Sequence, residues 1–257
     1  MAIMFFNFAM PSLIMAVLTY GMHSPLPDGW NRVDVSTISF RGGDIDSSSL
    51  KSFTELVDHR TDTLILTSRG GDVDAAIGMG REIHGRGISV VVRGYCVSSC
   101  ANYLFLSGRR RIIEPNSFVG FHGTVTSMDI ERLIARIKSS GEAAGKQDEE
   151  VEMDIRYARS DIERLRSMER DFATLVGFSQ SLLIESGFER LSDSAKKTLP
   201  EYPVLFPSAE TLNNCYGILG VEDQSRAENP NLDTLGERGA PGLGFTLLGD
   251  DWFTNCD

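Results

Sequence analysis

The chain has 257 residues, 41% of them hydrophobic and 24% charged, which is enough apolar material for one domain with a full core and an appendage. Its formal net charge of −11 argues against nucleic acid as a partner, because binding to phosphate backbones needs a basic surface. The same acidity argues against adhesion to an anionic membrane surface. Composition therefore indicates an ordinary globular protein whose acidic surface keeps it solvated.

The first 24 residues differ from the rest of the chain. No charged side chain occurs between Ala2 and Met22, and most residues there are apolar. Such a segment predicts a secretory signal peptide or an N-terminal membrane anchor. A buried core helix is the alternative, and the prolines at Pro25 and Pro27 argue against it. We therefore expect an exported protein, either periplasmic or anchored in the membrane and facing the periplasm.

Four cysteines follow this leader, at Cys96, Cys100, Cys215 and Cys256. In an exported protein, an even number of cysteines suggests disulfides. Residues one helical turn apart have Cα atoms roughly 6 Å apart, which suits a Cys96–Cys100 bridge and leaves Cys215–Cys256 as the second pair. Free buried thiols and a zinc site are the alternatives, zinc being the weakest because few histidines lie nearby. We expect neither a metal nor another cofactor.

The region from residue 35 to residue 121 alternates between strand and helix patterns. The pattern predicts a strand, a helix capped by Asp46, a strand, a helix, a strand and a helix, at 35–40, 46–57, 63–67, 73–85, 88–92 and 99–106. Two more short strands, 111–113 and 117–121, flank a turn at Pro115 and Asn116. Short loops between alternating elements predict parallel crossovers, so we expect an α/β fold with a mostly parallel sheet.

From about Met128 to Leu183 the pattern becomes that of one long helical stretch, interrupted at Ser139–Gly141 and at Asp148–Glu150. Its apolar residues recur at steps of mostly three and four, as in a heptad seam: Ile130, Leu133, Ile134, Ile137, Val151, Ile155, Ala158, Ile162, Leu165, Phe172 and Leu175. Two helices packed on the body, or an arm that mates with another subunit, would both produce this pattern. The predicted organisation is a leader at 1–24, a domain at 25–222 containing the arm at 126–186, and a loosely ordered tail at 223–257.

Residues suited to acyl transfer lie at the ends of the predicted strands. That chemistry needs a nucleophile, a base and hydrogen-bond donors for the oxyanion. Ser98 lies where a strand turns into a helix, so that the amide of Ser99 can face a bound carbonyl. Gly70 and Gly71 follow the adjacent strand, at the end where open α/β sheets bind their ligands.

Three histidines outside the leader compete for the role of base. His59 and His84 lie near predicted helix ends among charged residues, where a solvated surface histidine is the usual interpretation. His122 ends an apolar strand between small residues that permit close approach. His122 is therefore the candidate, although a single histidine at a strand end is more often structural than catalytic.

Three blocks of the sequence resemble the proteolytic subunit of the Clp protease, in the same order and at similar spacing. They are Thr67–Val73, Gly94–Ala101 and Pro115–His122, and the resemblance spans roughly residues 35–222. It implies a Clp/crotonase-like ββα superhelical fold, with the long helical stretch in the place of the handle helix that interlocks subunits. The leader and the cysteine-flanked serine look closer still to exported, Clp-like bacterial proteins.

The resemblance implies a role for each matched residue. Ser98 would be the nucleophile, with Ser99 as the weaker alternative, and His122 would be the base. The loop Gly70–Gly71 and the amide of Ser99 would form the oxyanion hole. Counting back from Tyr216, the acid that orients the histidine would be Glu201, with Asp193 second and Asp171, inside the long helix, third.

The expected function is that of an exported serine hydrolase, most simply a peptidase. Its expected partners are peptide or unfolded-protein substrates and further copies of itself. One alternative is a non-catalytic scaffold or binding protein that keeps the fold. Others are a crotonase-like acyl-transfer enzyme and, less favoured because the lysines lie away from the sheet ends, a serine–lysine peptidase.

Overall fold

The structure, a computed structural model, describes residues 28–185, 203–225 and 246–250, so the predicted leader lies outside the described residues. Seven strands form the main sheet, in the order β1-β2-β3-β4-β5-β8 with β6 also paired to β4. Only β1 runs antiparallel to its neighbour. The strands are β1 (Gly29–Arg32), β2 (Thr37–Arg41), β3 (Thr63–Ser68), β4 (Ser89–Val97), β5 (Arg111–Ile113), β6 (Phe118–Gly120) and β8 (Val221–Asp223). The predicted α/β fold with a mostly parallel sheet is confirmed.

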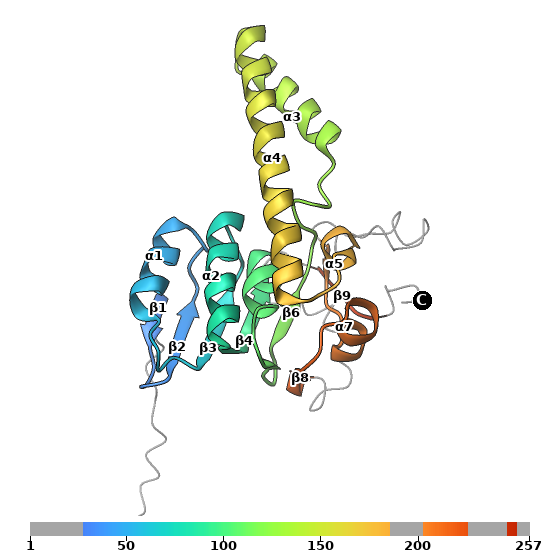
Figure 1. Cartoon of the computed structure of the whole chain (residues 1–257). Helices are drawn as coiled ribbons and strands as arrows, with labels where there is room; N and C mark the ends of the chain where they lie inside the picture. Colours follow the sequence, from blue (N-terminus) through green and yellow to red (C-terminus); the bar gives the residue numbers. More distant parts are fainter. Residues whose placement is uncertain (1–27, 186–202, 226–245, 251–257) are drawn as a thin grey trace, which may run out of the picture.

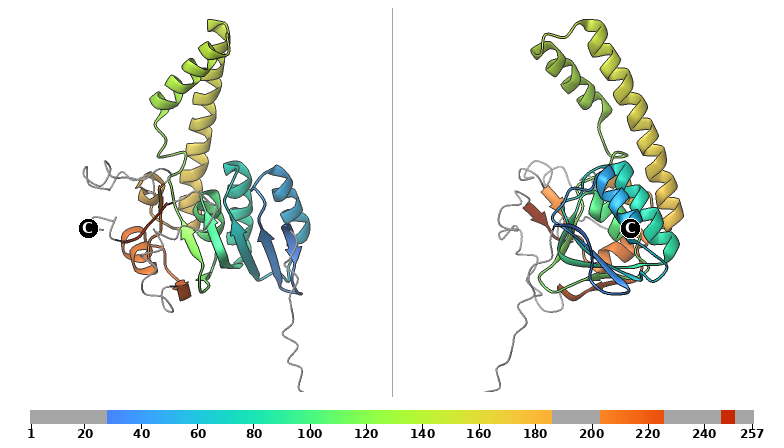
Figure 2. Two further views of the ribbon diagram at one scale, coloured as in Figure 1. Left: turned by 180° about the vertical axis from the view of Figure 1, so that it is seen from behind. Right: turned by 90° about the vertical axis from the view of Figure 1, so that its left-hand side faces the viewer.

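The first two helices begin and end where the sequence predicts. Helix α1 (Ser47–Leu56) starts at a capping box in which the Asp46 carboxylate accepts the Ser49 amide at 2.7 Å. Helix α2 (Val73–Arg86) is capped by Asp72 and ends at Gly87, whose φ of 65° is left-handed. Both helices lie in front of the strands in Figure 1 and behind them in the left view of Figure 2, so they cover one face of the sheet.

Strand β4 is long enough to pair with two strands in succession along one edge. Its first half, Val90–Val92, pairs with β5, and its second half, Tyr95–Val97, pairs with β6. A shift in register against β3, after Leu66, accompanies the change. As a result, the carboxyl ends of β4 and β6 lie side by side, and the residues that follow them, Ser98 and Phe121–His122, are neighbours.

The remaining elements follow β4 along the chain. The segment predicted as a helix at 99–106 is a π-helix, η1 (Cys100–Phe105). The other helices are α3 (Ile130–Ala143), α4 (Asp148–Val176), α5 (Ser181–Glu185) and α7 (Ala209–Tyr216). A second, two-stranded parallel sheet joins β7 (Pro203–Leu205) to β9 (Thr246–Leu248). Sequence patterns missed β1, β7 and β8, and β9 lies inside the segment predicted as a loose tail.

Helices α3 and α4 form an arm that projects from the body in every view of Figures 1 and 2. The arm has its own small core, in which Ile134, Val151 and Ile155 are buried. Farther along α4, Phe172 is fully buried in the main core, so this helix anchors the arm in the body. Among the described residues, no helix combines the length and apolarity needed to cross a membrane.

Of the two interruptions predicted in the long helical stretch, the one at Ser139–Gly141 is wrong, whereas the one at Asp148–Glu150 lies next to the observed break. Helix α3 continues to Ala143, and the break comes just before α4 begins at Asp148. Gly141 is buried because α3 and α4 meet there, and a Cβ at this position would lie 2.5 Å from Val151 Cγ2. Leu175, which the seam pattern assigns to the core, is 49% exposed.

The packing of helix α2 against Phe172, through which α4 is anchored in the body, can be tested at two glycines of α2. A Cβ on Gly80 would lie 2.8 Å from Phe172, from Ser107 Oγ and from the Tyr103 carbonyl, whereas a Cβ on Gly85 would meet nothing within 4 Å. We expect Gly80→Ala to lower the free energy of unfolding by about 1 to 3 kcal/mol through overpacking. Gly85→Ala, the matched control, is expected to raise it by up to about 1 kcal/mol through helix propensity. Urea unfolding of both variants measures this, and equal effects would contradict the packing.

Candidate active site

Ser98 occupies the turn between β4 and the π-helix η1 in an unusual backbone conformation. Its φ is 60°, in the left-handed region that residues with a Cβ rarely adopt. The Ser98 amide donates to the Gly120 carbonyl at 3.1 Å, and its carbonyl accepts the Asn102 amide at 2.8 Å. Strain of this kind costs on the order of 1–3 kcal/mol and persists where the surroundings fix the chain. The half-buried Ser98 hydroxyl forms no hydrogen bond with the residues that the structure describes.

A disulfide holds the two sides of this turn together. Cys96 lies one residue before the end of β4, and Cys100 begins η1. The two are bonded with a Cα–Cα distance of 5.3 Å, and both are fully buried. The predicted Cys96–Cys100 bridge is confirmed, so the alternative interpretations of this pair, free thiols and a zinc site, are excluded. The other predicted pair, Cys215–Cys256, involves Cys256, which lies outside the described residues.

Ser99 has its hydroxyl committed to a structural contact. Its Oγ donates to the Gly71 carbonyl at 2.7 Å, and the residue is only 4% exposed. Of the two adjacent serines, Ser98 is thus the one whose hydroxyl is available to a ligand. The Ser99 bond also ties the turn of β4 to the loop after β3.

The loop after β3 packs so closely against the Ser98 turn that only glycine fits. Gly70 and Gly71 have φ values of 98° and 149°. A Cβ on Gly70 would lie 2.8 Å from both Ser98 Cβ and the Ser99 nitrogen. A Cβ on Gly71 would lie 2.2 Å from the Ile45 carbonyl oxygen.

The three amides predicted for the oxyanion hole are not equivalent. The Gly70 N–H donates to Ser68 Oγ at 3.1 Å and is therefore occupied. The N–H groups of Gly71 and Ser99 donate no hydrogen bond within the part of the chain that the structure describes. Because the Ser99 hydroxyl binds the Gly71 carbonyl, these two amides belong to one fixed unit beside Ser98. Two unused amides at such a position can hold a developing oxyanion.

His122 lies at the matching end of the neighbouring strand. The residue before it, Phe121, exchanges two backbone hydrogen bonds with Leu205 of β7, at 2.8 and 2.6 Å. The His122 side chain is exposed, yet nearby protein displaces enough water to lower its pKa below the ordinary 6.5, against a smaller opposing effect of a hydrogen bond to its own backbone. No hydrogen bond joins His122 to Ser98 in this structure. Catalytic hydrogen bonds are often loose in ligand-free enzymes and tighten when substrate binds.

The two carboxylates favoured as the third catalytic group, Glu201 and Asp193, lie outside the described residues. Asp171, the third choice, is described and is exposed on α4. Among the described residues, no group of three or more His, Cys, Asp or Glu side chains could hold a metal ion.

Sequence reasoning missed a buried carboxylate, Glu169 of α4, which fixes the chain just after His122. It is 0% exposed and accepts hydrogen bonds from the Val125 amide at 3.0 Å, from the Thr126 amide at 2.7 Å and from the Thr126 hydroxyl. The Tyr103 hydroxyl of η1 also donates to it. Burial, followed by the charge of Glu169, raises the pKa of Tyr103, which keeps that group a neutral donor.

A second positioning contact comes from Asn102, one turn after Ser98. Its Nδ2 donates to the carbonyl of Gly123, the residue that follows His122, at 3.0 Å. Glu169 and Asn102 therefore hold the histidine segment against α4 and η1. A signal for Glu169 was present in the sequence, since an acid stands at a seam position between Leu165 and Phe172 in the apolar stripe.

Comparison with known proteins gives similarity of structure alone. No family model and no curated protein matches the sequence. The chain is similar to ClpP1 from Listeria monocytogenes (20% identity, TM-score 0.32, 46% of this chain and 78% of that one) and to a point mutant of that protein (21%, 0.33, 48% and 80%). It is also similar to a mutant of the 1510-N membrane-bound stomatin-specific protease (18%, 0.29, 46% and 66%). Similarities at this level carry no conclusion about activity.

The hydrogen bonds of Glu169 predict different effects for two variants, Glu169→Gln and Tyr103→Phe. Glu169→Gln leaves only one acceptor oxygen for the amides of Val125 and Thr126, whereas Tyr103→Phe leaves both acceptors in place. We expect the first variant to lose about 1.5–3 kcal/mol of stability and the second about 1 kcal/mol. Amide hydrogen exchange is the direct measurement: one or both of the Val125 and Thr126 amides should lose protection in Glu169→Gln and keep it in Tyr103→Phe. Unchanged protection in both would show that Glu169 does not fix this segment.

Proposed function

We propose that the chain is a serine hydrolase, and specifically a peptidase, with Ser98 as nucleophile and His122 as base. The observation that carries the proposal is the combination at one sheet edge of a left-handed serine and two unused amides. His122 follows the strand that pairs with β4 up to Val97, one residue before Ser98. A purely structural turn would have no need of this combination.

In the proposed reaction the Ser98 hydroxyl oxygen attacks the carbonyl carbon of the scissile peptide bond while its proton passes to the His122 imidazole. The negative charge that forms on the carbonyl oxygen is held by the amides of Gly71 and Ser99. His122 then gives its proton to the departing amine, leaving an acyl group on Ser98. Water, deprotonated by His122, hydrolyses this ester and restores the serine.

The acid of the proposed triad is Glu201. Strand β7 begins two residues later, at Pro203, and its Leu205 is hydrogen-bonded to Phe121, the residue before His122. The chain that carries Glu201 thus continues into the strand beside the histidine. Asp193 is the second choice, because β7 begins only ten positions after it.

We also propose that the protein works outside the cytoplasm, as a homo-oligomer. The apolar leader and the Cys96–Cys100 disulfide both favour an oxidising compartment. Such a compartment lacks ATP to drive unfolding, so short or already unfolded peptides are the proposed substrates. In support of assembly, Met153 and Tyr157 lie one turn apart on the arm and are 59% and 75% exposed.

A non-catalytic binding protein is the second candidate. The observation in its favour is that Ser98 and His122 form no hydrogen bond with each other in this structure. A crotonase-like enzyme would use the same two amides without needing the serine.

The proposal predicts covalent labelling at one residue. A fluorophosphonate probe should label the full chain, and Ser98→Ala should abolish the labelling. His122→Ala should slow it by at least about 100-fold, as expected for loss of a general base. Ser99→Ala is the control at the adjacent position and should still be labelled at Ser98. Intact-mass and peptide mass spectrometry identify the site, and absence of wild-type labelling would favour the binding protein.

The lowered pKa of His122 predicts the pH dependence of labelling. The imidazole acts as a base only when neutral, so the labelling rate should rise with pH through the pKa of His122 and then level off. Because desolvation lowers that pKa, the midpoint should lie below 6.5 and most of the base should be neutral at pH 7.5. A midpoint above 6.5 in stopped-time labelling assays would contradict this.

A further inference from the structure

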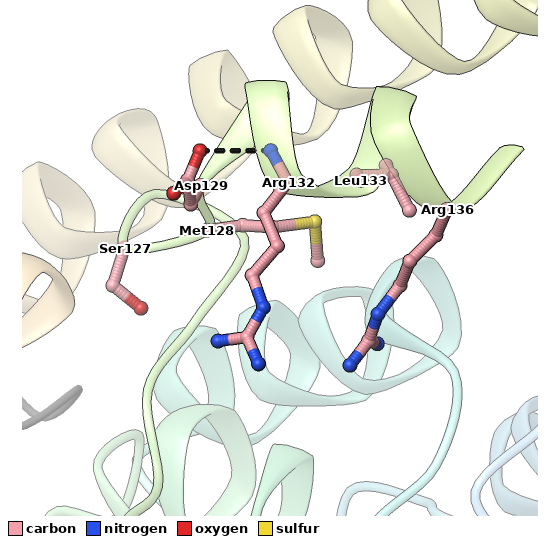
Figure 3. A pocket seen from close by; sticks show the side chains of 6 residues that line it. All are labelled: Ser127, Met128, Asp129, Arg132, Leu133 and Arg136. Carbon is pink, nitrogen blue, oxygen red and sulfur yellow. Dashed lines mark hydrogen bonds between the residues drawn. The ribbon is translucent and has the colours of Figure 1, made fainter. Parts of the chain in front are cut away.

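A pocket at the base of the arm carries two arginines that the proposed chemistry does not use. It has a volume of about 360 Å³ and is lined by Ser127, Met128, Asp129, Arg132, Leu133 and Arg136. Figure 3 shows the Arg132 and Arg136 side chains leaving α3 in the same direction, with both guanidinium groups below the helix in that view. Below them in that view are the helices of the body.

The charges of this pocket are unbalanced. Arg132 and Arg136 are one turn apart on α3, an arrangement of like charges that destabilises a helix. Neither guanidinium forms an ion pair with a carboxylate in the described ranges, whereas Arg159 and Arg164 of the same arm pair with Glu131 and Asp74. The acid inside the pocket, Asp129, caps α3 by accepting the Arg132 amide at 3.1 Å.

We propose that Arg132 and Arg136 bind a carboxylate of the peptide substrate, either an Asp or Glu side chain or the chain's own C-terminus. This inference rests on the proposed function and names the substrate class of the same site. Guanidinium groups suit this ligand because their planar array of N–H donors matches a carboxylate. Next to them, Met128, which is 41% exposed, and Leu133 offer apolar contact to the stem of the bound side chain.

The pocket lies within reach of a peptide held at Ser98. Five residues of chain lead from His122 to Ser127, so the two are at most about 18 Å apart. This connection is fixed, because Glu169 holds the amides of Val125 and Thr126. Arg166 also donates to the carbonyls of Val125 and Met128, at 3.2 and 2.6 Å. Arg132 lies five residues beyond Ser127, so the chain keeps its Cα within about 36 Å of His122. An extended substrate advances about 3.3 Å per residue, so the recognised carboxylate lies within about eleven residues of the cleaved bond.

The net charge of the chain makes such a site selective. With a net charge of −11, the protein as a whole repels acidic peptides, so two arginines without ion-pair partners in the described residues provide a local site where a carboxylate is stabilised. The interaction is partly exposed and should therefore weaken as salt screens it.

Binding of fluorescent decapeptides to the full chain carrying Ser98→Ala, followed by anisotropy, tests the site without turnover. One peptide set carries Glu at successive positions and a C-terminal amide; its matched set carries Gln. A third peptide has Gln throughout and a free C-terminus. At one position, the Glu peptide should bind about tenfold more tightly than its Gln counterpart, or the peptide with a free C-terminus should bind about tenfold more tightly than the amidated one. This difference in affinity should decrease as NaCl is raised from about 50 to about 500 mM.

Variants of α3 locate the site. Adding Arg132→Gln and Arg136→Gln should remove the carboxylate preference, while Lys138→Gln, a cation on the same helix outside the pocket, should leave it unchanged. A preference that survives the double variant, or equal binding of all peptides, overturns the inference. The inference is also overturned if the double variant changes only the oligomeric state, measured by ultracentrifugation. That result would mean that a second copy of the chain, and not a peptide, binds at the pocket.

Fluorophosphonate labelling of the otherwise wild-type chain separates the two proposals. Normal labelling of Ser98 without any carboxylate preference refutes the pocket and leaves the hydrolase intact. Carboxylate binding through Arg132 and Arg136 without labelling refutes the hydrolase and leaves an acidic-peptide binding site.

Discussion

The close packing of the glycine loop after β3 against the turn after β4 is the constraint on which the rest of the site depends. Gly70 lies so near Ser98 and Ser99 that no side chain fits, and the Ser99 hydroxyl fastens the two loops through the Gly71 carbonyl. With the Cys96–Cys100 bridge beneath it, the turn keeps Ser98 in a left-handed conformation. The same packing leaves two amides unused, and this makes an oxyanion site possible.

The arm extends this arrangement beyond the sheet. Helix α4 is part of the body at Phe172 and part of the arm at Val151, and Glu169 lies on it between these two regions. The buried Glu169 carboxylate is tolerated because it accepts hydrogen bonds from the Val125 amide, from the amide and hydroxyl of Thr126 and from the Tyr103 hydroxyl. Most of these donors belong to the segment after His122. One carboxylate thus links the segment after His122 to the helix that carries the arm.

The arrangement also explains where a peptide would be recognised. In the proposed reaction, the carboxyl ends of the strands carry the nucleophile and the amides, whereas the segment from Gly123 to α3 leads from His122 to Arg132 and Arg136. The proposed reactive groups and the proposed carboxylate-binding arginines therefore come from different elements, joined by a short stretch that both Asn102 and Glu169 fix. Substrate preference could change along α3 without disturbing the chemistry at Ser98.

Local chemistry by itself determined much of this protein. The capping acid Asp46 predicts where α1 begins, and alternating short elements predict the parallel sheet, because these signals act within a few residues. The disulfide between Cys96 and Cys100 was equally predictable, because the two residues lie one helical turn apart in the sequence. Tertiary structure alone decided the rest. Gly141 ends no helix but admits Val151, and Glu169 meets Val125 and Tyr103 across elements far apart in sequence. Such contacts depend on which residues the fold brings together, and no local pattern encodes that.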